Sequence, residues 1–62
     1  MTIYVIEIWR RVMDGREYCS SRFFSDIVTA KRALFLTGFR AIDDLVYQKG
    51  DLRATLTERT LE

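Results

Sequence analysis

A chain of 62 residues has room for one small domain, and a domain of this length buries only about 60% of the surface that its unfolded chain exposes. Hydrophobic residues make up 48% of the sequence and the net charge is +1, which excludes a disordered chain and a strongly basic one. One cysteine and no histidine exclude an intrachain disulfide and leave few ligands for zinc. We therefore expect a single domain at residues 1–62 that is further stabilised as a homodimer.

The sequence carries no membrane or export signal that we can identify. No apolar run approaches the roughly 20 residues that cross a bilayer, and the first ten residues alternate between polar and apolar side chains. A lone Cys19 is consistent with a reducing compartment. These features predict a cytoplasmic protein without membrane contact.

The first half of the chain has the pattern of a β-hairpin. Residues 2–13 are rich in Ile, Val, Tyr and Trp, and residues 16–24 resume an extended pattern. Asp14-Gly15 stands between them and is typical of a two-residue type I′ loop. Such a loop pairs residues whose numbers sum to 29, which predicts the pairs Glu7–Arg22, Ile6–Phe23 and Arg11–Tyr18.

A helix of about three turns follows the hairpin. Ser25 is the expected N-cap, Asp26 lies in the first turn, and Gly38 is the expected left-handed stop. Helical spacing puts four residues on one stripe with Ala33 beside it: Ile27, Ala30, Leu34 and Thr37. Three apolar residues fall outside the stripe and either pack on the Phe39 segment or second hairpin, or form a dimer contact: Val28, Phe35 and Leu36.

The last third of the chain indicates a second hairpin. Residues 42–48 and 52–59 flank the turn Lys49-Gly50-Asp51, although residues 41–46 are also compatible with a continuation of the helix. A two-residue turn gives five residues to the core: Leu45, Tyr47, Leu52, Ala54 and Leu56. The predicted fold is α+β, in the order ββαββ, with a four-stranded antiparallel sheet and one helix packed on one face.

The expected register divides the first hairpin into two faces. The face toward the helix carries six residues suited to a core: Tyr4, Ile6, Ile8, Val12, Cys19 and Phe23. The opposite face mixes aromatic and arginine side chains, which are enriched at the energetic centres of protein interfaces. The predicted partner-binding residues on this face are Trp9, Arg11, Arg16, Tyr18, Arg22 and Phe24. The structural alternative is that Trp9 and Phe24 complete a second small core under a folded-back terminus.

The sequence does not support catalysis. Without histidine, neither a Ser-His-Asp nor a Cys-His arrangement exists within the chain. Asp43 and Asp44 are adjacent, so in a strand they point to opposite faces and do not form a carboxylate pair. Calcium-loop spacing and a glycine-rich phosphate loop are also missing. We therefore predict a protein that is not an enzyme, with no cofactor, no metal and no small-molecule substrate.

Two functions remain for the aromatic and arginine-rich face. The first is docking on a protein partner, as an inhibitor or adaptor of the kind found among phage and prophage accessory proteins. The alternative is nucleic-acid binding, in which the aromatic side chains stack on bases and the arginines contact phosphates. The near-neutral total charge and the nearby acids Glu7 and Glu17 argue against nucleic acid.

Overall fold

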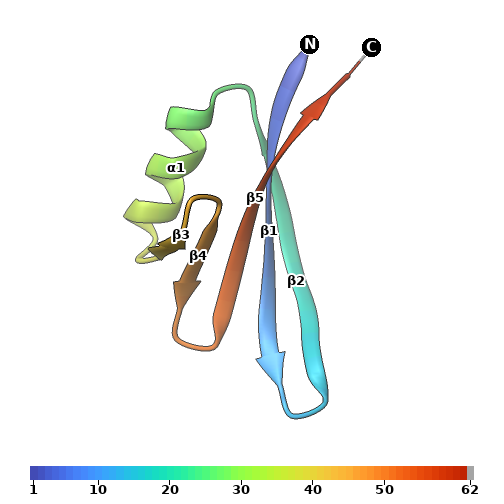
Figure 1. The fold of residues 1–62 in the computed structure, drawn as a ribbon, viewed down its shortest axis with the longest axis vertical. Helices are drawn as coiled ribbons and strands as arrows, with labels where there is room; N and C mark the ends of the chain where they lie inside the picture. The colour runs from blue at the N-terminus through green and yellow to red at the C-terminus, as the bar shows by residue number, and fades with distance from the viewer. Residues whose placement is uncertain (62) are drawn as a thin grey trace.

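The computed structural model describes residues 1–61, which form one five-stranded sheet and one helix (Figure 1). The spatial order of the strands is β2-β1-β5-β4-β3, and every neighbouring pair is antiparallel. An antiparallel α+β fold with one helix is therefore confirmed within these residues, whereas the expected count of four strands is wrong. The elements in chain order are β1 (Thr2–Val12), β2 (Gly15–Phe24), α1 (Ile27–Leu36), β3 (Arg40–Asp43), β4 (Val46–Lys49) and β5 (Leu52–Thr60).

The additional strand comes from residues 40–49, which fold into a short hairpin. Asp43 pairs with Val46, so the loop is the dipeptide Asp44-Leu45. The Asp43 carboxylate accepts a hydrogen bond from the Asp44 backbone N–H at 2.8 Å, a local bond that favours a turn over a continued strand or helix. Residues 41–46 are thus not helical. The predicted core residue Leu45 lies in this turn and is 43% exposed, so its assignment to the core is wrong.

Helix α1 begins at a different cap from the one expected. Asp26, not Ser25, is the N-cap, and its side chain accepts hydrogen bonds from the backbone N–H and the hydroxyl of Thr29, both at 3.0 Å. These bonds satisfy a donor that the first turn leaves without an intrahelical partner. They also hold the pKa of the Asp26 carboxyl below its ordinary value, because they favour the ionised form.

The Asp26 cap predicts a dependence of stability on acid. Since its pKa is lower in the folded state than in the unfolded state, the contribution is complete above about pH 5 and is lost as the pH falls through about 4 toward the lowered value. The Asp26→Asn variant accepts the same hydrogen bonds without ionising in this range. The difference between the thermal midpoints of wild type and variant should therefore shrink on acidification, and an unchanged difference from pH 6 to pH 2 would contradict this role.

Gly38 ends the helix as expected. Its φ of 93° lies in the region that glycine adopts without the steric cost of a Cβ. The Gly38 N–H donates to the Phe35 carbonyl at 3.1 Å and the Phe39 N–H donates to the Leu34 carbonyl at 3.0 Å, which is the Schellman arrangement. The Lys49 ammonium adds a 2.7 Å hydrogen bond to the Thr37 carbonyl, so β4 is tied to the C-terminal end of α1.

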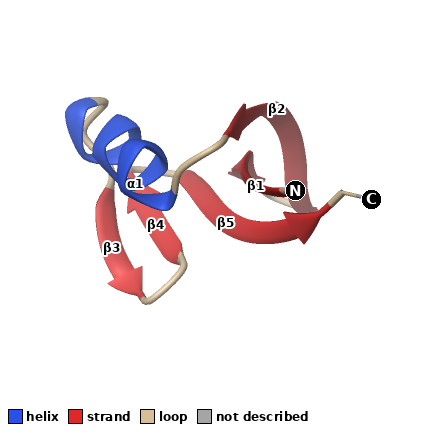
Figure 2. Cartoon of the chain, turned by 90° about the horizontal axis from the view of Figure 1, so that it is seen from above, coloured by secondary structure: helices blue, strands red, loops and turns tan. Residues whose placement is uncertain are grey.

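The core lies between α1 and the sheet. Figure 2 shows the helix against one side of the strands. The predicted helix residues Ala30 and Leu34 are buried, and the even-numbered residues of β1 face them, as expected. The buried cluster consists of Ile6, Ala30, Leu34, Phe39, Tyr47, Ala54 and Leu56, with Tyr4, Ile8, Phe24, Ile27 and Leu52 packed against it.

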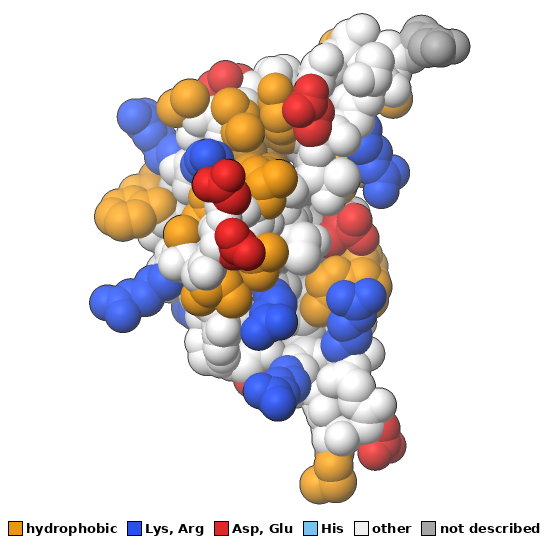
Figure 3. Space-filling model, in the orientation of Figure 1, with side chains coloured by type: hydrophobic (Ala, Val, Ile, Leu, Met, Phe, Trp, Pro, Cys, Tyr) orange, Lys and Arg blue, Asp and Glu red, His pale blue; other side chains and the backbone are white. Residues whose placement is uncertain are grey.

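The outward side of α1 remains apolar and exposed. Val28, Phe35 and Leu36 are 62%, 76% and 73% exposed, so the expectation that they pack on the Phe39 segment or the second hairpin is wrong. In Figure 3, hydrophobic side chains lie on the surface on the same side of the molecule as α1. Their alternative use as a dimer contact stays a prediction.

The register of the first hairpin differs from the expected one in two steps. Val12 pairs with Gly15, so the loop is Met13-Asp14 and paired numbers near the turn sum to 27. A type I′ loop at Asp14-Gly15 would need a positive φ at Asp14, whereas in residues 1–61 only glycines have one. A bulge between Ile8 and Trp9 then leaves Cys19 without a cross-strand partner. From the pair Ile8–Ser20 onward, the paired residue numbers sum to 28.

The bulge exchanges the two faces in the second half of β2. A register with a sum of 29 and one with a sum of 27 place each β2 residue on the same face, so the predicted faces are correct from Gly15 to Tyr18. A sum of 28 places each β2 residue on the opposite face, so the predicted faces are wrong beyond Cys19. The predicted pairs Glu7–Arg22, Ile6–Phe23 and Arg11–Tyr18 are all wrong. Arg22 and Phe24 lie on the helix side, Phe23 is 66% exposed on the other side, and Cys19 is exposed instead of buried in the core.

Candidate partner-binding surface

The sheet face opposite α1 carries aromatic and arginine side chains from three strands. Trp9 in β1 pairs with Tyr18 of β2 on one side and with Arg53 of β5 on the other. Arg11 in β1 pairs with Arg16 of β2. Side chains of directly paired residues point to the same face, so these five residues share one surface, which we call the outer face.

Trp9 is the centre of a compact side-chain cluster on the outer face. The ring of Tyr18 meets it edge-on, with centroids 5.1 Å apart and an interplanar angle of 73°. The guanidinium carbon of Arg16 lies 4.3 Å from the Trp9 ring centroid, within the range of a cation–π contact. A cation–π contact therefore joins Arg16 to Trp9, whereas the predicted contact between Arg11 and Tyr18 is wrong. Arg16 covers one face of the indole ring.

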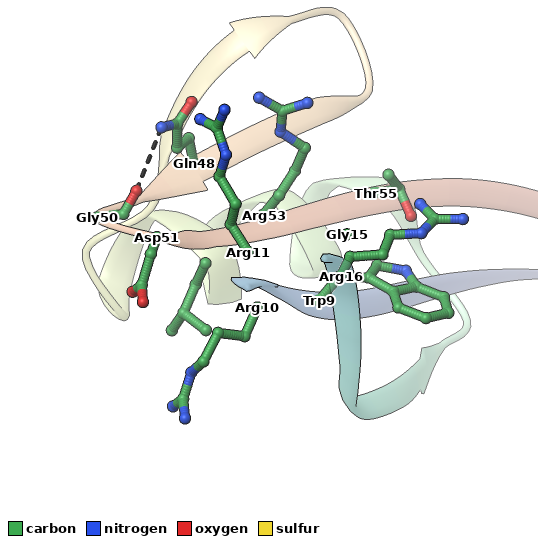
Figure 4. A pocket seen from close by; sticks show the side chains of 11 residues that line it. Trp9, Arg10, Arg11, Gly15, Arg16, Gln48, Gly50, Asp51, Arg53 and Thr55 are labelled. Carbon is green, nitrogen blue, oxygen red and sulfur yellow. Dashed lines mark hydrogen bonds between the residues drawn. The ribbon is translucent and has the colours of Figure 1, made fainter. Parts of the chain in front are cut away.

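A groove of about 610 Å³ adjoins this cluster (Figure 4). It lies where the end of β1, the start of β2 and the β4–β5 turn meet, and Trp9 forms part of its wall. The Arg11 backbone N–H donates to the Asp51 carbonyl at 2.7 Å, which holds the β4–β5 turn beside β1. A hydrogen bond of 3.2 Å from the Gln48 amide to the Gly50 carbonyl braces the same turn.

The groove is strongly basic although the whole chain is nearly neutral. Its lining includes four arginines and one carboxylate: Arg10, Arg11, Arg16, Arg53 and Asp51. In the described chain, residues 1–61, the ion pair within 4.0 Å joins Arg59 to Glu7 and involves none of the groove arginines. Within this distance, no carboxylate of residues 1–61 forms an ion pair with a groove arginine, so the charges of the guanidinium groups remain available to a ligand.

Four of the six predicted partner-binding residues come together, and two do not. Trp9, Arg11 and Arg16 line the groove, and Tyr18 is 50% exposed beside Trp9. The assignment of Arg22 and Phe24 to this surface is wrong, because the bulge turns both toward α1. Phe24 packs against the main core with the Arg22 guanidinium 5.1 Å from its ring centroid. The alternative of a second core containing Phe24 is wrong for the same reason.

Two arginines of the groove were not among the predicted partner-binding residues. Arg53 reaches the groove because β5 pairs with β1, and Arg10 lies at the groove edge near the end of β1. The local pattern of the second hairpin already places Arg53 on its outer side, but nothing local indicates that this hairpin joins the first one edge to edge. The pairing Trp9–Arg53 is a long-range contact.

Other classes of site have little support in the described part of the chain. Over residues 1–61, no group of three or more His, Cys, Asp and Glu side chains is placed to hold a metal ion. Within the same residues, no helix has the length and apolar character needed to cross a membrane. Comparison of the chain with protein-family models, with curated proteins and with solved structures found no match.

Proposed function

We propose that this protein is a non-enzymatic binding module that docks on a protein partner through its outer face. The observation that carries the proposal is the ordered cluster of Arg16, Trp9 and Tyr18 beside the groove. Trp, Tyr and Arg are the residue types that most often dominate interface energies. Here their side chains are already held against one another, which lowers the conformational entropy lost on binding.

Nucleic-acid binding is the second candidate, and the four groove arginines favour it. Sheet-face readers of single strands, however, stack bases on exposed aromatic rings. Arg16 occupies one face of Trp9, and Phe24, the third aromatic expected to stack, packs against the core. These positions favour a protein partner over nucleic acid. The homodimer, the inhibitory role typical of phage accessory proteins and the cytoplasmic location stay predictions.

Docking through the outer face predicts which substitutions weaken partner binding. Partners retained by the immobilised protein from a lysate of its source cells would be purified and titrated calorimetrically. Trp9→Ala should raise the dissociation constant by at least about tenfold, because it removes the centre of the cluster.

Arg22→Ala is the matched control for this experiment. It removes a guanidinium that also lies over an aromatic ring, but on the helix side of the sheet. Its dissociation constant should remain within about twofold of wild type. Equal dissociation constants for wild type and a folded Trp9→Ala variant, checked by circular dichroism, would reject the outer face as the docking surface.

A further inference from the structure

The arginines of the groove are positioned by the sheet itself. Arg11 and Arg16 are directly paired across β1 and β2, and Arg53 lies opposite Trp9 on β5. Like charges in direct cross-strand pairs destabilise a sheet. The Arg11–Arg16 pair therefore does not favour folding, and neither arginine takes part in the ion pair found within residues 1–61. An anionic ligand would relieve this repulsion, which is the behaviour expected of a binding site.

The concave shape strengthens the effect of the charges. Cationic groups that line a groove with low-dielectric walls concentrate the field inside it and attract anions. Figure 4 shows arginine side chains entering the groove region from β1, β2 and β5. The groove volume of about 610 Å³ accommodates several side chains of a ligand, more than a single small anion requires.

One feature of the groove favours a peptide over a nucleic acid as the source of the anionic groups. Guanidinium groups bind carboxylates and phosphates in a bidentate manner, so the arginines alone do not discriminate. Arg16 already covers one face of Trp9, the ring on which a base of a nucleic acid would stack. A peptide needs no stacking ring, since it carries its negative charges on separate side chains.

We infer that the groove binds an acidic segment of the partner protein, with aspartate or glutamate carboxylates on Arg11, Arg16 and Arg53. The inference rests on the proposed function and names the chemistry of the partner. Trp9 forms part of the groove wall and offers an apolar surface beside these arginines. In an extended segment, the acidic residues that reach these arginines are every second residue, because successive side chains point to opposite sides.

The single tryptophan of the chain makes the groove directly observable. Trp9 fluorescence would be followed during titration with a short peptide of alternating Glu and Leu, with its Gln and Leu counterpart, and with an oligothymidylate of equal charge. The acidic peptide should bind tightest, and its affinity should fall as salt is added, since exposed charges are screened. The double variant Arg11→Ser/Arg53→Ser should bind it about tenfold more weakly. Arg22→Ser, on the opposite face, should bind it as wild type does.

The outcomes against the inference are distinct from those against the proposed function. Three results would overturn the inference that the groove binds an acidic segment: equal binding of the Gln and Leu peptide, no binding of the acidic peptide, or an unchanged affinity of the double variant for the acidic peptide. The proposed docking on a protein would still be tested separately, by the titration of the Trp9→Ala variant with the purified partner. Tighter binding of the oligothymidylate than of the acidic peptide would assign the groove to nucleic acid and overturn both.

Discussion

Replacing Leu34 with alanine should lower the free energy of unfolding by about 2–5 kcal/mol. Leu34 is 2% exposed, lies on the inner side of α1 and belongs to the cluster that joins the helix to the sheet. A domain of this length has a total stability of about 3–9 kcal/mol, so one cavity removes a large part of it. Urea denaturation followed by far-ultraviolet circular dichroism would measure the loss.

Leu36→Ala provides the matched control in the same helix. Leu36 is 73% exposed, so its truncation removes the same atoms without opening a cavity, and the expected change is within about 0.5 kcal/mol. The two variants together report which side of α1 faces the sheet. Equal losses for Leu34→Ala and Leu36→Ala would contradict the orientation of the helix.

The second large effect is expected from adding volume to the core. Ala54 is fully buried on β5, which lies between β1 and β4 in the sheet. Ala54→Leu introduces three carbon atoms at a site without free space, which should lower the free energy of unfolding by about 1–3 kcal/mol. The measurement is again the urea midpoint at constant m-value, since a changed m-value would indicate loss of two-state unfolding.

Ala41→Leu makes the same chemical change where space is available. Ala41 is exposed on the edge strand β3, so the added side chain meets solvent and stability should change by less than about 0.5 kcal/mol. A tolerated Ala54→Leu, with a loss no greater than that of Ala41→Leu, would show that the helix does not pack closely over β5.

Stability and partner binding can be altered separately in this fold. Leu34 and Ala54 lie in the cluster on the helix side of the sheet, whereas Arg11, Arg16 and Arg53 line the groove on or beside the outer face. Residues on opposite faces of the sheet that share no contacts usually have additive effects. Substitutions of the groove arginines should therefore weaken binding without the loss of stability expected for the core variants.

Features that depend on neighbouring residues could be predicted from the sequence. Gly38 ends the helix because its positive φ is a local steric requirement. The alternation of β1 placed Ile6 under the helix and Trp9 and Arg11 on the other side, because the side-chain period of a strand is two. The faces of Arg16 and Tyr18 were also predicted correctly, although the loop is displaced, since a shift of two in the sum of paired numbers leaves the faces unchanged.

Features that depend on distant pairing were decided only by the tertiary structure. The bulge at Cys19, which moves Arg22 and Phe24 to the helix side, leaves no signal in a regular alternation of residue types. The alignment of Trp9 with Arg53 requires β1 and β5 to be neighbours, and the sequence pattern of each hairpin is the same whether or not the two hairpins join. The amino-acid sequence thus determined which residues share a face within each strand, because that property is local. The groove required the order of the strands, because its arginines come from segments that only the folded sheet brings together.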